Sequence, residues 1–316
     1  MVSGIVILIF IAGIAAGVIF LLRTINSHEE KLDDISNVEP EPEPEPEPKI
    51  PELIDLQKTV DAWVKTQKNA KNSGIIIYDI ENDEVVAKHN ENQKFRIESI
   101  YKMFVALEGY YRIDSGKWKG DDTYRIAKDF NNKTYTRYLC LDHMIRYSYS
   151  ICAEVMWNEI GHGNLQTIYN NKGYKNTSIQ GLTSTPSDLM KLYQEYWEHE
   201  DLSEDSWEKI KDSMLNQKAN TKNTTYNRNW RQGLPSGFST AKVYNKVGWL
   251  GDGRGNWTYY DDAAFLVFPE KAENKDGEKV LERHYIMIAL TNYTSPKQLV
   301  ELGKKVESAV KTADKY

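Results

Sequence analysis

One serine and one lysine in this chain have the types and the spacing of a nucleophile and its base. Ser99 and Lys102 form a Ser-x-x-Lys pair. The same spacing recurs at Ser206/Lys209 and Ser239/Lys242. A lysine beside a serine can remove the hydroxyl proton and so activate the oxygen for attack on a carbonyl carbon. Because the spacing is common in proteins, the surroundings must decide which pair carries chemistry.

The surroundings of Ser99 favour the first pair. Ser99 precedes an apolar segment, residues 102–111, that predicts a buried helix. At a helix N-terminus the helix dipole and free backbone N–H groups stabilise developing negative charge. Lys102 lies one turn later on the same side, where partial burial would favour its neutral form. The alternative is a capping serine followed by a solvated lysine, and the polar, acidic surroundings of Ser206 fit that alternative.

Two later segments complete a pattern. Ser148-Tyr149-Ser150 and Lys246-Val247-Gly248 follow in that order. Together with Phe-Arg-Ile-Glu-Ser-Ile-Tyr-Lys-Met-Phe-Val-Ala-Leu at residues 95–107, they resemble the Ser-x-x-Lys, Ser-x-Asn and Lys-Thr-Gly segments of class A β-lactamases and related penicillin-binding proteins. Residues 231–237 resemble the approach to the Lys-Thr-Gly strand, and residues 261–267 resemble the strand after it. The resemblance covers about residues 52–316.

This resemblance implies catalytic roles for four side chains. Ser99 would be the nucleophile and Lys102 its base or proton shuttle. Ser148 would relay protons toward the leaving group, and Lys246 would supply positive charge for the Ser148 hydroxyl and for a substrate carboxylate. The backbone N–H groups of Ser99 and Trp249 would form the oxyanion hole. The resemblance implies no metal and no cofactor.

The sequence departs from the family pattern in three places. Val247 stands where the family usually has Thr or Ser, so a hydroxyl donor to a substrate carboxylate is missing. Ser150 replaces an Asn whose longer amide would hold the substrate and Lys102. Class A β-lactamases carry a glutamate on a loop that activates the deacylating water, whereas residues 161–186 contain neither Asp nor Glu. General-base catalysis is worth about 10²–10⁴-fold, so deacylation is expected to be slow. The nearby acids Glu159 and Asp188 fit helix surface charges.

Several further side chains are candidates for binding substrate. Arg231 and Arg254 could bind a carboxylate through the bidentate guanidinium, or they could simply be surface arginines. Aromatic side chains could line a cleft or belong to the core, namely Trp230, Trp249, Trp257, Tyr259 and Tyr260. The residues predicted to bind substrate are Ser150, Val247, Gly248, Trp249 and Arg254.

Composition restricts the partners. The formal net charge of −6 gives no support for nucleic-acid binding. The six histidines form no zinc-binding motif, so no metal site is predicted. The two cysteines, Cys140 and Cys152, could form a disulfide in an exported domain, or they could be two small buried thiols.

The N-terminal part predicts a membrane anchor and a spacer. Residues 4–22 are uncharged and almost wholly apolar, and as a helix they would span about 28 Å, close to the roughly 30 Å bilayer core. A cleaved signal peptide is the alternative, but the run lacks a basic region before it and a clear cleavage site after it. Residues 24–51 include five Glu-Pro repeats at residues 39–48, which predict an extended linker. We therefore expect an anchor at 1–23, a linker at 24–51 and one domain at 52–316.

The remaining pattern predicts an α+β domain. An N-terminal helix is followed by strands at 74–80 and 85–88, a mostly helical middle with helix over most of 136–160, and a helix opened by Thr185-Pro186. Strands at 243–250, 263–268 and 285–292 precede a last amphipathic helix opened by Ser295-Pro296. We expect an antiparallel sheet built from both chain ends, flanked by the terminal helices, with a separate helical lobe.

These features predict a membrane-anchored, extracytoplasmic serine hydrolase of the β-lactamase type. It would form an acyl-enzyme at Ser99 with β-lactams or with D-Ala-D-Ala-type peptides of a cell wall. The alternatives are a non-catalytic relative that binds wall fragments or a partner protein, which Val247 and Ser150 favour, and an esterase or peptidase that uses the same dyad.

Overall fold

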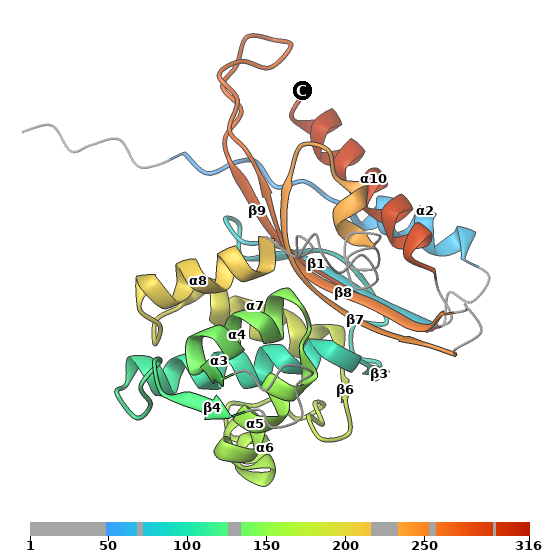
Figure 1. Cartoon of the computed structure of the whole chain (residues 1–316). Coiled ribbons are helices and arrows are strands. Elements are labelled where there is room, and N and C mark those ends of the chain that lie inside the picture. Colours follow the sequence, from blue (N-terminus) through green and yellow to red (C-terminus); the bar gives the residue numbers. More distant parts are fainter. Residues whose placement is uncertain (1–48, 68–71, 126–133, 216–232, 253–256, 293–294) are drawn as a thin grey trace, which may run out of the picture. The chain divides into compact units, whose positions relative to one another are not determined.

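Strands from both ends of the domain form one five-stranded antiparallel sheet in the computed structural model (Figure 1). The structure describes residues 49–67, 72–125, 134–215, 233–252, 257–292 and 295–316. The strand order is β2-β1-β9-β8-β7. The strands are β1 (Ser73–Asp79), β2 (Glu84–His89), β7 (Lys242–Gly251), β8 (Trp257–Phe268) and β9 (Arg283–Thr291). The predicted sheet from both chain ends is confirmed, and β8 begins earlier than the sequence pattern predicts.

The two terminal helices cover one face of this sheet (Figure 1). They are α2 (Gln57–Thr66) and α10 (Pro296–Ala313). Ser295 and Gln298 form a capping box that starts α10, which satisfies two of the free N–H groups at the helix end. The Trp63 indole donates a hydrogen bond to the Gln298 carbonyl at 2.9 Å and so joins the two helices. Their apolar stripes form a core with this face of the sheet.

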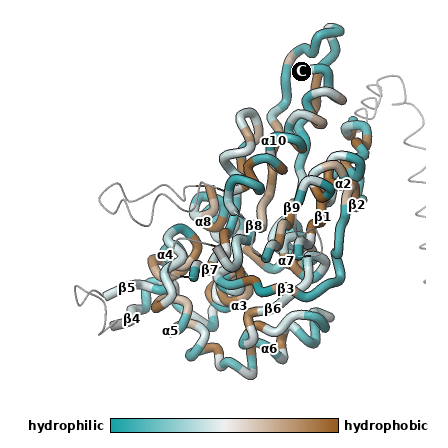
Figure 2. Tube along the Cα trace, turned by 90° about the vertical axis from the view of Figure 1, so that its right-hand side faces the viewer, coloured by the Kyte–Doolittle hydropathy of each residue, from teal (hydrophilic) through white to brown (hydrophobic). Residues whose placement is uncertain are grey.

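The other face of the sheet packs against a helical lobe. Its helices are α3 (Tyr101–Asp114), α4 (Arg137–Arg146), α5 (Ser150–Ile160), α6 (His162–Asn171), α7 (Pro186–Glu198) and α8 (Glu204–Leu215). Short elements complete the chain, namely β3 (Phe95–Arg96), η3 (Glu98–Ile100), β4 (Thr123–Arg125), β5 (Thr134–Thr136), β6 (Thr183–Ser184) and η4 (Leu234–Gly237). Apolar residues gather in α3 and in the strands (Figure 2), as expected for a helix at the centre of the lobe.

Residues 136–160 are helical over most of their length, as predicted, but the helix is interrupted. Helix α4 ends at Arg146, and α5 begins at Ser150. Between them Ser148 has a φ of 53°, in the left-handed region that a non-glycine residue rarely adopts. The periodicity of apolar residues does not reveal this break, because the core face continues from α4 into α5.

Cys140 and Cys152 form a disulfide. It joins α4 to α5 across the turn that holds Ser148, with a Cα–Cα distance of 5.0 Å. Of the two alternatives for the cysteines, the structure therefore has the paired form. Both cysteines are fully buried in the lobe core.

The predicted anchor at residues 4–22 and the Glu-Pro segment at 39–48 lie outside the described residues. Within the described ranges, each helix is either too short or too polar to cross a membrane. The domain itself is one compact unit over residues 50–316, which is close to the predicted boundary at residue 52.

Candidate active site

Ser99 lies in the short helix η3, which runs directly into α3. The preceding Glu98 has a φ of 38°, so the backbone is constrained immediately before the serine. The edge strand β7 passes beside η3, and Gly248 makes this approach possible. A Cβ atom on Gly248 would overlap the Ile97 carbonyl oxygen and lie 3.2 Å from Ile100 Cγ1. Strand β7 therefore lies directly against Ile97 and Ile100, the residues on either side of the Glu98–Ser99 segment.

Lys102 lies one turn after Ser99, and its side chain is buried with 1% exposed. Its Nζ atom is 3.0 Å from Ser99 Oγ and 3.1 Å from Ser150 Oγ. It also lies 2.7 Å from the Ser148 carbonyl oxygen and 3.2 Å from Ser148 Oγ. An ammonium has only three hydrogens, so it cannot donate to all four oxygens at once. A neutral amine, in contrast, can accept the Ser99 proton through its lone pair while its two hydrogens are donated to two of the other three oxygens.

Burial lowers the pKa of Lys102 to about 7, against the opposing influence of the carboxylates of Glu154 and Glu98. A substantial fraction of the lysine is then neutral at pH 7. This is the state that a general base requires.

The Ser148 hydroxyl lies between two lysines. Its oxygen is 3.2 Å from Lys102 Nζ and 3.0 Å from Lys246 Nζ. The left-handed backbone of Ser148 turns the chain between α4 and α5 so that its carbonyl oxygen also reaches Lys102. Strained backbone of this kind clusters at functional sites. The arrangement forms a continuous path of hydrogen-bonding groups from Ser99 through Lys102 and Ser148 to Lys246.

Lys246 extends from β7 toward this hydroxyl and is fully buried. Its Nζ atom also donates to the Val247 carbonyl oxygen at 2.8 Å. Burial lowers the pKa of Lys246 well below its usual value, the positive charge of Lys102 lowers it further, and Asp262 opposes the shift. Two buried lysines close to one hydroxyl therefore disfavour the state in which both are charged.

The outer side of the site is accessible. Ser99 and Ser148 are half-buried, whereas Ser150 is exposed. Tyr149 packs against the lobe core and Trp249 against the core under the terminal helices. The site thus combines a buried base with a partly exposed serine, as an attack on an external carbonyl requires.

The structure separates Ser99 from the other Ser-x-x-Lys pairs. The Ser206 hydroxyl donates to Asp114 at 2.9 Å, and Lys209 pairs with Asp205. The Ser239 hydroxyl donates to Glu307 at 2.8 Å. A further pair that the sequence prediction does not use, Ser308 and Lys311, lies on α10. The hydroxyls of Ser206 and Ser239 thus serve the fold, and among the described residues of these pairs Ser99 is the serine that contacts its own lysine.

The predicted substrate-binding residues are found in different surroundings. Ser150 and Gly248 lie at the site. Val247 is fully buried in the core between the sheet and the terminal helices, so its side chain is not available to a ligand at the Ser99 face. Alternate residues of β7 point to opposite faces, which places Lys246 and Gly248 on the side of η3 and the Val247 side chain in the core. Substrate binding by Val247 stays a prediction. Arg231, Arg254 and Trp230 lie outside the described residues.

Carboxylates near the site differ in how they are engaged. Glu159 bonds to Tyr124 and Arg137, and Asp188 accepts hydrogen bonds from Asn176 N and Thr177 Oγ1, so neither is available to a water at Ser99. The sequence prediction assigned no role to Glu154, which acts electrostatically on Lys102. Its spacing of four residues from Ser150 is the signal that could have identified it.

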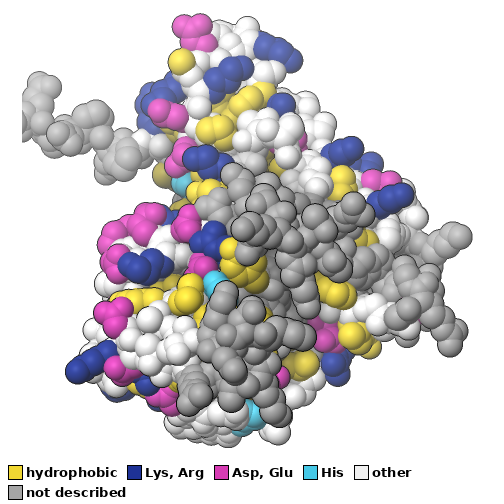
Figure 3. Space-filling view, in the orientation of Figure 1, with side chains coloured by type: hydrophobic (Ala, Val, Ile, Leu, Met, Phe, Trp, Pro, Cys, Tyr) yellow, Lys and Arg dark blue, Asp and Glu magenta, His cyan; other side chains and the backbone are white. Residues whose placement is uncertain are grey.

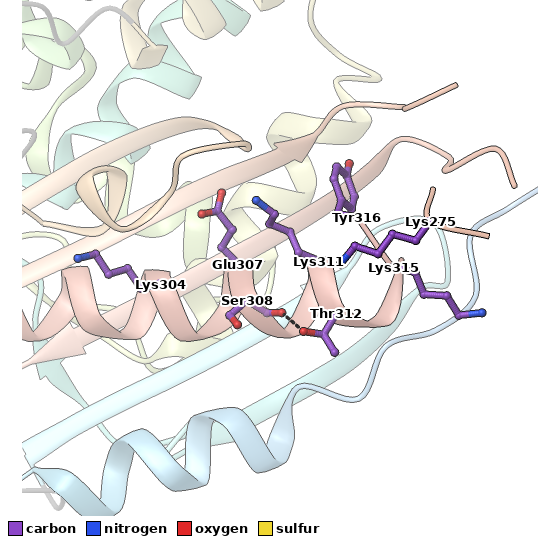
Figure 4. A pocket seen from close by; sticks show the side chains of 8 residues that line it. All are labelled: Lys275, Lys304, Glu307, Ser308, Lys311, Thr312, Lys315 and Tyr316. Atoms are coloured by element: carbon purple, nitrogen blue, oxygen red, sulfur yellow. Dashed lines mark hydrogen bonds between the residues drawn. The ribbon is translucent and has the colours of Figure 1, made fainter. Parts of the chain in front are cut away.

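Other described parts of the surface can be compared with the Ser99 site for metal-binding groups and hollows. Within the described ranges, no group of three His, Cys, Asp or Glu side chains could hold a metal ion. A hollow of about 490 Å³ beside α10 is lined by the side chains in Figure 4, among them Lys304, Glu307 and Lys311. The Glu307 carboxylate accepts hydrogen bonds there from the backbone N–H groups of residues 239–241. On the described part of the face in Figure 3, basic and acidic side chains are interspersed.

Comparisons with known proteins agree with this geometry. Solved structures that share the fold include a β-lactamase from Chitinophaga pinensis (14% identity, 80% of this chain, 98% of that chain, TM-score 0.64). PBP-A shares 17% identity, over 81% of this chain and 97% of that chain, with a TM-score of 0.63. A class A β-lactamase from Bacteroides cellulosilyticus shares 16% identity, over 81% of this chain and 96% of that chain, with a TM-score of 0.61. These identities show the fold alone. No curated protein matches the sequence. The model of the "Beta-lactamase enzyme family" matches residues 55–283, most of the chain, and supports a serine hydrolase of the β-lactamase type. The chain therefore belongs to the beta-lactamase enzyme family.

Proposed function

We propose that the chain forms an acyl-enzyme at Ser99 with β-lactams or with D-Ala-D-Ala-type wall peptides. The observation that carries this proposal is the position of Lys102 Nζ, buried and 3.0 Å from Ser99 Oγ. A lysine with a pKa of about 7 can take the serine proton at neutral pH. One solved relative by fold is a mutant of PBP-A in an acyl-enzyme complex with penicillin G, which favours this class of ligand.

The proposed acylation needs no group outside the site. Neutral Lys102 accepts the Ser99 proton as Oγ attacks the carbonyl carbon. The carbon–nitrogen bond of the lactam or peptide then breaks, and Lys102 returns the proton to the leaving nitrogen through the Ser148 hydroxyl. Lys246 holds that hydroxyl at 3.0 Å and contributes positive charge for a substrate carboxylate. Backbone N–H groups of Ser99 and Trp249 would stabilise the oxyanion.

The disulfide supports a location outside the cytoplasm, because disulfides persist mainly in oxidising compartments. We propose that residues 4–22 anchor the chain in a membrane and that residues 24–51 hold the domain away from it, so that the site meets wall material. A membrane-impermeant amine reagent applied to intact cells should modify the full-length chain. Modification only after lysis would contradict this topology.

A fluorescent penicillin tests the acylation proposal. The full-length chain in detergent should take the label covalently, and Ser99→Ala should abolish it. Ser239→Ala is the matched control, because Ser239 belongs to a Ser-x-x-Lys pair whose hydroxyl bonds to Glu307 instead. Absence of label on the wild-type chain at high probe concentration would contradict the proposal. Ester hydrolysis lost in Ser99→Ala, without penicillin labelling, would indicate a general esterase or peptidase.

The second candidate is a non-catalytic relative that binds wall fragments or a protein partner. It is favoured by Val247, whose burial leaves the Ser99 face without the hydroxyl donor usual in the family. Binding of a wall peptide that is retained in Ser99→Ala, together with no covalent label, would support this candidate.

A further inference from the structure

One face of α5 carries three side chains at consecutive helical turns. Ser150, Glu154 and Trp157 are spaced i, i+4 and i+7, so they lie on the same side of the helix. The first and last of them contact the beginning of α3. Ser150 Oγ lies 3.1 Å from Lys102 Nζ. The Trp157 ring lies 5.2 Å from the Tyr101 ring, measured between centroids. Glu154 is therefore held between two contacts that both face the residues directly after Ser99.

The negative charge of Glu154 acts on both Tyr101 and Lys102. Its carboxylate opposes the burial that lowers the pKa of Lys102. It also adds to the burial that raises the pKa of Tyr101 to about 12. The charge of Glu154 thus acts on the buried base, in agreement with its place on the face of α5 that carries Ser150 and Trp157.

Glu154 is also chemically available. Its side chain is exposed, and within the described part of the chain it has no hydrogen bond or ion pair. The other carboxylate that acts on Lys102, Glu98, forms an ion pair with Arg96 at 3.0 Å. Residues 161–186 offer no carboxylate at all. Glu154 is consequently the described acid near Ser99 that can hold a water molecule.

We propose that Glu154 is the general base that activates water for deacylation of Ser99, from helix α5 instead of from a loop. This inference rests on the proposed function, because it needs an acyl group on Ser99. Slow deacylation is expected because residues 161–186 contain neither Asp nor Glu. With Glu154 as the base, it would apply only to variants that lack the Glu154 carboxylate.

The proposed step is balanced without any further reactant. The Glu154 carboxylate removes one proton from water while the water oxygen forms a bond to the acyl carbonyl carbon. The carbonyl π electrons move to the oxygen and then return as the bond between that carbon and Ser99 Oγ breaks. The proton on Glu154 passes to Ser99 Oγ, which restores the hydroxyl and the carboxylate and releases the acid product.

The test separates acylation from release. The full-length chain in detergent is labelled with fluorescent penicillin, excess probe is removed, and loss of label is followed with time. Glu154→Gln should slow the release by about 10²–10⁴-fold, the usual contribution of a general base. It should not slow labelling. Because it removes the charge that raises the pKa of Lys102, the pH profile of labelling should move to lower pH.

Two variants serve as controls. Glu154→Asp keeps a carboxylate and should restore part of the release rate. Glu159→Gln changes an acid on the same helix that is bound to Arg137, and its release should match the wild type. The inference is overturned if Glu154→Gln releases label at the wild-type rate, if Glu159→Gln slows release equally, or if the labelled wild type never releases. A wild-type chain that takes no label overturns the proposed function itself, and this step with it.

Discussion

Lys102 and Lys246 share one hydrogen-bonding partner, the Ser148 hydroxyl oxygen, which lies 3.2 Å and 3.0 Å from their Nζ atoms. The two lysines come from opposite sides of the site, one from helix α3 and one from strand β7. Both are buried, so their mutual repulsion is weakly screened. A single hydroxyl between them can pass a proton outward while Lys246 keeps its position. The Ser148 hydroxyl and the two lysines thus connect the helical lobe to the sheet through the groups proposed to react.

Removal of the bridging hydroxyl should slow acylation. Ser148→Ala deletes the proton path, so the rate of labelling by fluorescent penicillin should fall by at least about 10²-fold. Ser148→Gly is the matched variant, because glycine accepts the φ of 53° without strain. It should label as slowly as the alanine variant but unfold at a higher temperature. Wild-type labelling by Ser148→Gly would show that the hydroxyl takes no part.

Acylation should depend on the protonation of Lys102. Burial lowers its pKa to about 7, so the neutral base is lost as the pH falls below that value. The labelling rate should therefore rise about tenfold per pH unit below pH 7 and level off above it. Rates measured from pH 5 to pH 9 check this profile. Lys102→Arg should remove labelling, because guanidinium does not deprotonate, and a rate independent of pH would contradict the role of Lys102.

Much of the site could be predicted from the sequence because its residues lie in ordered motifs. The convergence of Ser99, Lys102, Ser148 and Lys246 follows from the family resemblance, and the structure brings these four together. The sheet from both chain ends also follows from the strand and helix order. These features depend on local patterns that the chain carries in each segment.

Other features depend on how distant segments pack, and sequence patterns do not reveal them. The turn at Ser148 places both its backbone carbonyl oxygen and its side-chain hydroxyl within hydrogen-bonding distance of Lys102, which belongs to a distant segment. Val247 looks like a binding position in the motif, but the alternation of β7 turns its side chain into the core. Glu154 belongs to the site only because α5 lies against the start of α3.

The disulfide should stabilise the turn that carries Ser148. It closes a loop with a sequence separation of 12 residues between the helices on either side of that turn. Loops of this size contribute about 3 kcal/mol when closed. The variant with Cys140→Ala and Cys152→Ala should lose about this free energy of unfolding in denaturant titrations and should also label more slowly. Reduced stability with unchanged labelling would restrict the disulfide to a role in stability.

Gly248 should tolerate no side chain. A methyl group there would overlap the Ile97 carbonyl oxygen, and backbone cannot move aside as a flexible side chain can. Gly248→Ala should push β7 away from η3 and displace Lys246 from Ser148, so labelling should fall more than overall stability. Gly116→Ala provides a comparison for a glycine with open space around it, where only the positive φ of 74° matters. Equal labelling by the wild type and Gly248→Ala would contradict this close approach.

A buried carboxyl beneath the site should give stability an unusual pH dependence. Asp261 pairs with Gly248 in the β7–β8 register, and burial raises its pKa well above 3.8 although the Thr291 N–H donates to it at 2.7 Å. The folded state therefore holds a proton that the unfolded state loses above about pH 4. Stability from this group is present at low pH and is lost as the pH rises toward the folded pKa.

Asp261→Asn should remove this dependence. The amide oxygen can still accept from Thr291, and the replaced Oδ2 has no hydrogen-bond partner in the described structure, so little is lost on substitution. The free energy of unfolding of the wild type should fall by up to about 1.4 kcal/mol per pH unit above pH 4, and the variant should show a shallower decline. Burial raises the pKa of Asp262 to about 7, so Asp262 should contribute the same loss of stability with rising pH in the wild type and in the variant. Denaturant titrations from pH 4 to pH 8 measure the difference, and parallel curves would mean that Asp261 is ionised in the folded protein.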